Sequence, residues 1–437
     1  MNTHRTALAA VTLSIAITAV PQAQAIGLLS LYQEAIVSDP QLLVAEAEVE
    51  IGEHQERQAL GNLLPQASAS ASVSRNRYNQ TTEIDYTGKR NTLTIRQPLF
   101  NGESWYELKR SQHNTDKQRA LYEDKRGALA LDLTDRYLNV LISENALQLA
   151  EAEQEATQLQ LEALRSRQKR QLAVKTDLLD VEARLQAIKV DVLEAGNSVN
   201  IAREGLTEMI NRPVTEELDD FDATIPYQRS ERTLEEWVDY AYQNSSLYKS
   251  LQEEVKVAQK LVRARRSGHF PTLDLQLNAQ RSNIGTENAP TTTTKSYTAS
   301  LNLSVPIFSG GRTSAAVRES HSRLKIANYR LEQLRRELRK GVRESFLNTA
   351  TGWSRIAAGK LTIAATTKSH EAMRQGLKYG TVTVVDVLDS LKEKLDSELV
   401  YKRAQYDFVR NYIQLQRLSG NLNAELIENV NAWQKRN

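Results

Sequence analysis

The chain has 437 residues, with 56 basic and 54 acidic side chains and a formal net charge of +2. This balance provides no global positive field, so the composition excludes a general nucleic-acid-binding protein and predicts no nucleic-acid partner. The sequence contains no cysteine, which excludes a disulfide scaffold, a thiolate metal site and an amino-terminally acylated lipoprotein.

The amino terminus has the pattern of a secretory signal peptide. His4 and Arg5 precede an apolar run over residues 7–20, and Ala23 and Ala25 form a small-x-small cleavage site. The run is too short for a membrane anchor, which needs about 20 residues. We expect cleavage after Ala25. Because an exported chain without disulfides is typical of a bacterial-type envelope, we place the protein there.

Beyond this leader the sequence contains the same ordered motifs twice, at an offset of roughly 207 residues, which indicates a duplicated structural unit. Each half predicts a helix, two strands, a very long helix, a turn and another helix. The segment between the halves is acidic and contains Pro213 and Pro226, as a linker does. The predicted organisation is a signal peptide (1–25), a first repeat (26–210), a linker and equatorial region (211–231), a second repeat (232–418) and an equatorial carboxyl-terminal tail (419–437).

Four runs alternate with period two and predict strands: Ala67–Tyr78, Thr92–Leu99 and their second-half counterparts at residues 273–279 and 297–307. Each is about ten residues, the length that a tilted strand needs to cross a bilayer. The polar segments Asn79–Arg90 and Ser282–Lys295 are expected to be surface loops of hairpins. A strand of a soluble sheet has the same alternation, but the surrounding helices are too polar to cover both faces of a sheet. Four strands cannot close a membrane barrel, so oligomerisation is implied, and three copies would supply 12 strands.

Two stretches predict very long helices. Residues 104–172 contain no proline and a single glycine, and apolar residues recur there at spacings of three and four. Such a helix is about 100 Å long. Residues 312–379 repeat the pattern. Their apolar stripes are thin and rich in alanine, which favours coiled-coil contacts with neighbours on both sides. A simple coiled-coil rod would explain the helices and leave the strands unexplained.

Catalytic chemistry is not indicated. The six histidines are scattered and include no HExxH motif, and the chain has neither a phosphate-binding loop nor a GxSxG nucleophile elbow. The sequence therefore predicts no enzyme, no cofactor and no metal site.

Several motifs resemble the TolC family of outer-membrane channel-tunnels. They are the strand-to-helix junctions at residues 98–102 and 306–311, the GHFPTLDL segment at 268–275 and the GTVTVVDVLD segment at 380–389. The similarity covers essentially the whole mature chain. It implies an α+β membrane protein with an internal tandem duplication. Three protomers would form a 12-stranded outer-membrane β-barrel, continued across the periplasm by a helical coiled-coil barrel with an equatorial collar.

The most informative polar residues are two Asp-x-x-Asp motifs, Asp177/Asp180 and Asp386/Asp389, each placed where a long helix turns into the next. Spacing i, i+3 puts the carboxylates of a pair on one helix face. Ordinary helix capping by Thr176, Asp177 or Thr383 is the alternative. In the resembled family, the positions of Asp386 and Asp389 line the periplasmic entrance, and that of Asp177 joins the network that closes it. Three copies would crowd these acids together, which raises some pKa values or attracts cations. We therefore expect a cation-selective, divalent-sensitive constriction that binds cations at Asp386 and Asp389.

The sequence departs from the family pattern at this entrance. Val382 and Leu377 occupy positions where the family's best-known member has an Arg and a Tyr that lock the entrance. We hypothesise that Lys175 or Lys378 supplies the missing cation. Adaptor contacts are expected on grooves near residues 171–177 and 379–382, with four candidates: Gln171, Leu172, Gly380 and Thr381.

The resemblance implies a passive exit duct for type I protein secretion, multidrug efflux, or both. Its expected partners are an inner-membrane ABC or RND transporter, a periplasmic membrane-fusion adaptor and outer-membrane lipid. The missing cysteine mildly favours the secretion branch over the lipoprotein efflux branch. Two alternatives stay open from the residues alone. A soluble periplasmic adaptor predicts a lipoyl-like β domain, and a general porin predicts many more than four strands.

Overall fold

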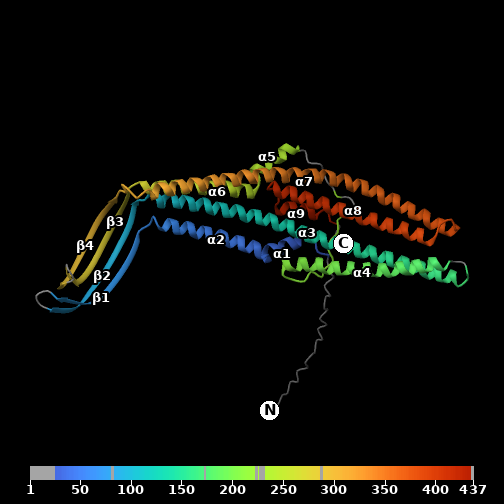
Figure 1. Cartoon of the computed structure of the whole chain (residues 1–437), viewed down its shortest axis with the longest axis horizontal. Coiled ribbons are helices and arrows are strands. Elements are labelled where there is room, and N and C mark those ends of the chain that lie inside the picture. The colour runs from blue at the N-terminus through green and yellow to red at the C-terminus, as the bar shows by residue number, and fades with distance from the viewer. Residues whose placement is uncertain are drawn as a thin grey trace, which may run out of the picture.

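The protein is elongated, with a bent four-stranded sheet at one end and two helical hairpins reaching the other (Figure 1). The computed structural model describes residues 25–79, 83–171, 174–221, 225, 232–285 and 289–434. The predicted signal peptide, apart from Ala25, lies outside these residues, as does the candidate adaptor contact Leu172.

The elements follow the duplicated order predicted from the sequence, and both halves build the same sequence of helices and strands. In the first half they are α1 (Leu28–Ser38), α2 (Pro40–Gly61), β1 (Gln66–Asn79), β2 (Glu83–Phe100), α3 (Gly102–Gln168) and α4 (Lys175–Ile210). In the second they are α5 (Leu234–Asn244), α6 (Ser246–Arg266), η1 (Ser267–His269), β3 (Thr272–Ile284), β4 (Pro290–Ser304), α7 (Arg312–Tyr379) and α8 (Val384–Leu418), followed by α9 (Ala424–Asn431).

The sheet has the antiparallel order β1-β2-β3-β4, so β1 and β4 are its two edges. Its strands reach further than predicted, and the two expected hairpin loops are wrong over most of their length. Residues 83–90 belong to β2, where Arg75 of β1 pairs with Asp85 at 2.9 Å, and residues 290–295 begin β4. The polar composition of these segments had indicated loops. They form strands because threonine has high strand propensity and cross-strand ion pairs stabilise exposed strands.

The register places the apolar alternating residues of all four strands on one face of the sheet. Ala69 lies opposite Leu93, Leu93 opposite Ala279, and Ala279 opposite Tyr297. The neighbouring rows carry serine, threonine, glutamine and asparagine on the other face. Thr94, for example, donates to Asn278 Oδ1 at 2.9 Å. A sheet with one continuous apolar face and one polar face is the arrangement that separates lipid from water in a membrane barrel.

The long helices α3 and α7 contain 67 and 68 residues, which confirms the two predicted lengths. Asn101 caps α3 by accepting a hydrogen bond from the Ser104 amide at 3.1 Å, and Gly311 begins α7 with a left-handed backbone (φ 79°). Within the described residues, no helix combines the length and apolar character needed to cross a membrane. The helices α3 and α7 instead pack side by side with α2, α4, α6 and α8 as hairpins (Figure 1).

The main core lies midway along the helices, where the start of the chain, the linker and the tail meet. Tyr137 and Phe408 are fully buried there. The linker forms bridges from Leu218 to Ile26 and from Phe221 to Gln434, and the Tyr137 hydroxyl donates to the Asp219 carbonyl at 2.6 Å. This region therefore fixes the helices of both halves at one level.

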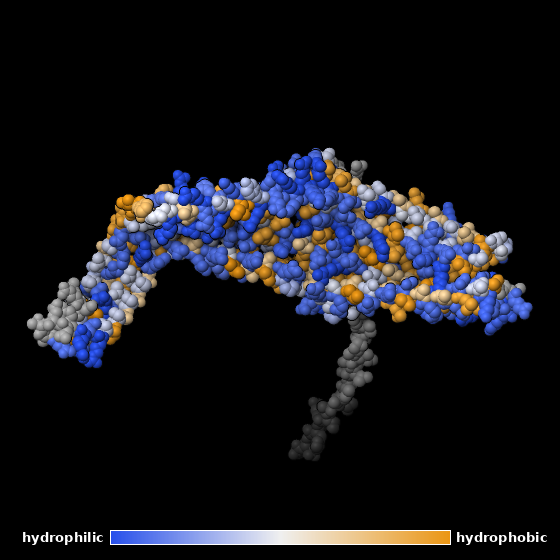
Figure 2. All heavy atoms as spheres, viewed as in Figure 1, coloured by the Kyte–Doolittle hydropathy of each residue, from blue (hydrophilic) through white to orange (hydrophobic). Residues whose placement is uncertain are grey.

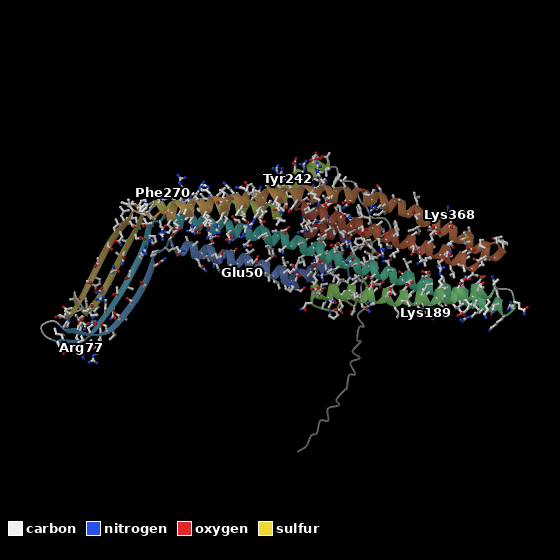
Figure 3. All side chains as sticks on the ribbon, viewed as in Figure 1. Glu50, Arg77, Lys189, Tyr242, Phe270 and Lys368 are labelled. Carbon is white, nitrogen blue, oxygen red and sulfur yellow. The ribbon has the colours of Figure 1, made fainter. Side chains whose placement is uncertain are left out.

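Hydrophilic and hydrophobic residues are interspersed over the helical part, and hydrophobic residues also lie at the bend between the sheet and the helices (Figure 2). Phe270 lies at this bend, Arg77 near the far end of the sheet, and Lys189 and Lys368 on the two helical hairpins (Figure 3). Ile307 and Phe308, between β4 and α7, are 93% and 88% exposed. Such exposure of large apolar side chains indicates a surface that is covered by another molecule or by lipid.

Candidate functional site

The predicted acidic residues lie where the two helical hairpins end, opposite the sheet (Figure 1). In the second hairpin, α7 ends at Tyr379, and the left-handed backbone of Gly380 (φ 72°) turns the chain. Thr381 stabilises this turn, because its amide donates to the Gly376 carbonyl at 3.0 Å. In the first hairpin, the positive φ of 59° falls on Gln171, an exposed residue beside the end of α3.

The start of α8 is a capping box formed by Thr383 and Asp386. The Asp386 carboxylate accepts from the Thr383 amide and hydroxyl, each at 2.7 Å, and Thr383 Oγ1 accepts from the Asp386 amide at 3.1 Å. The Thr383 hydroxyl and amide hold the pKa of Asp386 below its ordinary value, so this carboxylate is ionised at neutral pH. The capping interpretation is therefore confirmed for this motif.

The first motif is different. The cap position of α4 is Val174, which makes no side-chain hydrogen bond to the helix. Thr176 donates to Asp177 at 3.4 Å, and both side chains remain near the surface together with Asp180. Thr176 and Asp177 are thus not N-caps of α4, in contrast to Thr383 in α8.

Arg184 of α4 connects the two hairpins at this end of the molecule. Its guanidinium forms an ion pair with Asp389 of α8 and donates to the Leu388 carbonyl at 3.2 Å. It also contacts Glu153 of α3 at 3.3 Å. Lys392 lies 3.9 Å from the same Glu153 carboxylate. Because Glu153 and Arg184 are only 12% and 21% exposed, this network is shielded from water more than a surface ion pair.

An apolar cluster lies next to this network and also joins the two hairpins. Its buried residues come from α3, α4 and α8: Leu161, Leu164, Val181, Leu185, Val384 and Leu388. Leu377 packs against the cluster from α7. Leu377 therefore contributes hydrophobic contacts between the hairpins.

Within the described residues of the single chain, neither Lys175 nor Lys378 forms an ion pair, and both are exposed, so the latch assigned to them stays a prediction about contacts in the assembled trimer. The side chain of Val382 is half-buried at the turn, against Gly376. The sequence analysis did not single out Arg184. The available signal was its spacing, because Arg184 follows Asp177 and Asp180 by seven and four residues on one helix face.

Comparison with known proteins places both halves in one family. The model of the family described as "Outer membrane efflux protein" matches residues 31–212 and 237–421. The chain is 26% identical to the proteases secretion protein PrtF of Dickeya chrysanthemi over 94% of this chain and 92% of the relative. It is also 26% identical to the outer membrane protein TolC of Vibrio cholerae, over 93% and 94%. A solved structure of CusC superposes with a TM-score of 0.80 at 15% identity, covering 91% and 92% of the two chains.

Proposed function

This chain belongs to the outer membrane efflux protein family, and we propose that three copies of it form a channel-tunnel that serves as a passive exit duct from the periplasm through the outer membrane. The predicted family, the α+β fold with its tandem duplication and the assignment to outer-membrane transport are thereby confirmed. This is a family of channel proteins and not of enzymes. A soluble adaptor and a general porin are set aside, because the family match spans both halves of the chain.

The observation that carries the proposal is the sheet. β1 and β4 are edges in the single chain, and an unpaired edge is not tolerated in lipid. Four strands are too few to close a membrane barrel, whereas three sheets joined edge to edge give a 12-stranded one. The continuous apolar face would then contact lipid, and the polar face, which carries the bidentate Arg96–Asp274 pair at 2.9 Å, would line the pore.

The bend marks the inner boundary of the membrane in this arrangement. Exposed aromatic side chains gather where the strands end, namely Phe100, Trp105, Phe270 and Phe308 at 44–88% exposure. Girdles of aromatic residues flank the apolar band of outer-membrane barrels at both interfaces. The helices beyond this level extend about 100 Å, long enough to reach well into the periplasm.

The hairpin ends form the periplasmic gate in this proposal. Asp386, Asp389, Asp177 and Asp180 contribute carboxylates, so the closed entrance of a trimer would favour cations at Asp386 and Asp389. Within one chain, Arg184 is the cation that holds Asp389. Together with the cluster around Leu377, it keeps the second hairpin against the first in the closed state.

The partners follow from the position of this gate. Gln171, Gly380 and Thr381 are exposed at the hairpin ends, where a periplasmic adaptor linked to an inner-membrane ABC or RND transporter would dock. Similarity to a protein named for protease secretion supports a protein substrate. The equal identity to TolC of Vibrio cholerae keeps both secretion and small-molecule efflux within the proposal.

Planar-bilayer recording of the detergent-solubilised protein tests the proposal. We expect discrete, long-lived channel insertions with a small, cation-selective conductance that divalent cations reduce. A protein that inserts no channels, while remaining folded by circular dichroism, would contradict a duct function. Pull-down from envelope membranes then identifies the adaptor and transporter.

A further inference from the structure

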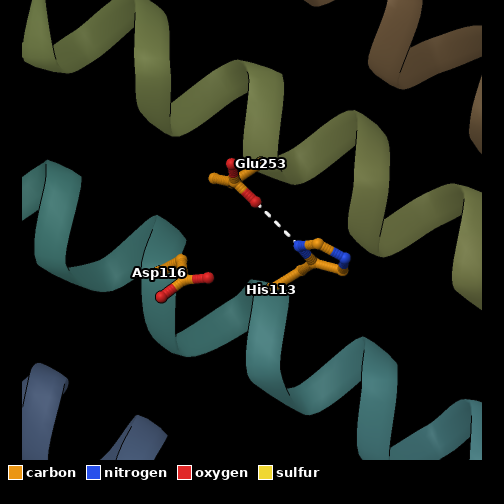
Figure 4. Close-up of side chains that lie close together, drawn as sticks. All are labelled: His113, Asp116 and Glu253. Carbon is orange, nitrogen blue, oxygen red and sulfur yellow. Dashed lines mark hydrogen bonds and ion pairs between the residues drawn. The ribbon is translucent and has the colours of Figure 1, made fainter.

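Three side chains that can bind a metal ion meet between the two halves of the duplication, far from the proposed gate. His113 and Asp116 lie on one face of α3, and Glu253 lies on α6, which packs against α3 (Figure 4). His113 Nδ1 is 2.9 Å from Glu253 Oε2. One donor atom from each of the three residues lies within 4.8 Å of the others.

A neighbouring cation contacts one oxygen of each carboxylate, and the other oxygen of Glu253 is hydrogen-bonded to His113. Lys256 binds Glu253 through Oε1 at 2.7 Å, so Oε2 is the atom that faces His113. Arg119 contacts Oδ1 of Asp116 at 3.3 Å but is held more closely by Glu53 at 2.8 Å. In the described part of the chain no bond engages Asp116 Oδ2. Asp116 is 53% exposed, so its carboxylate can rotate.

The distances suit a four- or six-coordinate transition metal. Ligand atoms about 2.1 Å from an ion are about 3.4 Å apart in a tetrahedron, the usual geometry of zinc, and about 3.0 Å apart when adjacent or about 4.2 Å when opposite in an octahedron. His113 Nδ1 and Glu253 Oε2 share a hydrogen bond at 2.9 Å, a separation close to that of adjacent ligands, so an ion bound there would replace the shared proton. The Asp116 carboxylate oxygen lies within 4.8 Å of the other two ligand atoms, and a rotation of its side chain would bring it to the spacing of a third ligand. Water would complete the shell, because the site is open on the side of Asp116.

We propose that His113, Asp116 and Glu253 bind one divalent transition-metal ion of the zinc class and thereby clamp α3 of the first half to α6 of the second. An imidazole nitrogen with two carboxylate oxygens favours Zn²⁺ and its first-row neighbours over Mg²⁺ and Ca²⁺, which prefer oxygen alone. Glu253 is 18% exposed and His113 25%, so binding also removes a polar pair from partial contact with water. The ion stabilises the helices on the sheet side of the core and takes no part in transport.

Direct titration tests the site independently of channel activity. The full-length protein is purified in detergent with a tag that lacks histidine, stripped with chelator and titrated with ZnCl₂ by calorimetry. We expect one saturable site per chain and a rise in the unfolding temperature, with neither effect from MgCl₂ at the same concentration. His113→Gln should weaken Zn²⁺ binding by at least about 10-fold, because loss even of residues that only support a ligand costs about 10–100-fold.

The matched control is His321→Gln, because His321 is an exposed histidine on α7 outside this cluster. It should bind Zn²⁺ as the unaltered protein does. A second variant, Glu253→Gln, keeps the side-chain size and should reduce binding similarly if His113→Gln fails to fold. Absence of a saturable site, or equal affinity in His113→Gln and His321→Gln, would overturn the proposal.

Discussion

Replacement of Arg184 by methionine should open the proposed gate. The side chain keeps a similar length but loses the cation that links α4 to α8. Three contacts disappear: the ion pair with Asp389, the contact with Glu153 at 3.3 Å and the hydrogen bond to the Leu388 carbonyl at 3.2 Å. Two of these reach across from the first hairpin to the second, so they are lost when the hairpins separate.

The size of the effect follows from the exposure of each partner. Asp389 is 64% exposed, so its ion pair contributes about 0.2–1 kcal/mol. The charged hydrogen bond to Leu388 contributes about 1.5–3 kcal/mol. Glu153 is 12% exposed, and without Arg184 it still has Lys392 at 3.9 Å as an ion-pair partner, which offsets part of the lost Arg184–Glu153 interaction. A total of about 2 kcal/mol per protomer converts to roughly a 30-fold shift towards the open state.

Single-channel recording measures this shift as open probability and mean conductance. The matched control is Arg165→Met, because Arg165 pairs with Glu182 at 2.8 Å within the first hairpin and does not reach the second. Arg184→Met should increase open probability at least about 10-fold, and Arg165→Met should leave it unchanged. Equal behaviour of the two variants in membranes, with both folded as trimers, would refute the role assigned to Arg184.

Three further predictions concern the cap, the sheet and the core. The pKa of Asp386 is lower in the folded chain than its ordinary value of 3.8. The Asp386 carboxylate therefore stabilises the fold above pH 3.8, and this stabilisation is lost as the pH falls through the folded pKa. Chemical unfolding over this range should show a weaker pH dependence for Asp386→Asn than for the unaltered chain. Leu301→Arg, on the apolar face, should cost up to about 2–4 kcal/mol and reduce the trimer recovered from outer membranes, whereas Ser300→Arg on the polar face should not. Tyr406→Phe removes the hydroxyl that donates to Asp220 at 2.7 Å and should lower the free energy of unfolding by about 1.5–3 kcal/mol, measured by denaturant titration; an unchanged value would show that the bond contributes nothing.

The architecture was largely predictable because its signals are local and long. The absence of proline and the spacing of apolar residues predicted α3 and α7 to within a few residues. Alternation predicted the four strands but not their full length. The extension of β2 back to Glu83 depends on pairing with β1, including the Arg75–Asp85 ion pair. The alternation of residues within one segment does not predict which strand it pairs with.

The contacts at the gate and at the candidate metal site could not be predicted in the same way. Arg184 and Asp389 are 205 residues apart, and His113 and Glu253 are 140 apart. Each pair joins the first half to the second. Only the packing of the two halves against each other brings them together. The sequence identified the acids at the hairpin ends and assigned their cation to nearby lysines, because proximity along the chain was the available guide.

Closure of three four-stranded sheets into one barrel is tested most directly by native mass spectrometry of the detergent-solubilised protein, released from its micelle. We expect one dominant species with the mass of three processed chains. A monomer or a dimer as the dominant species, from protein that is folded and extracted from outer membranes, would contradict it.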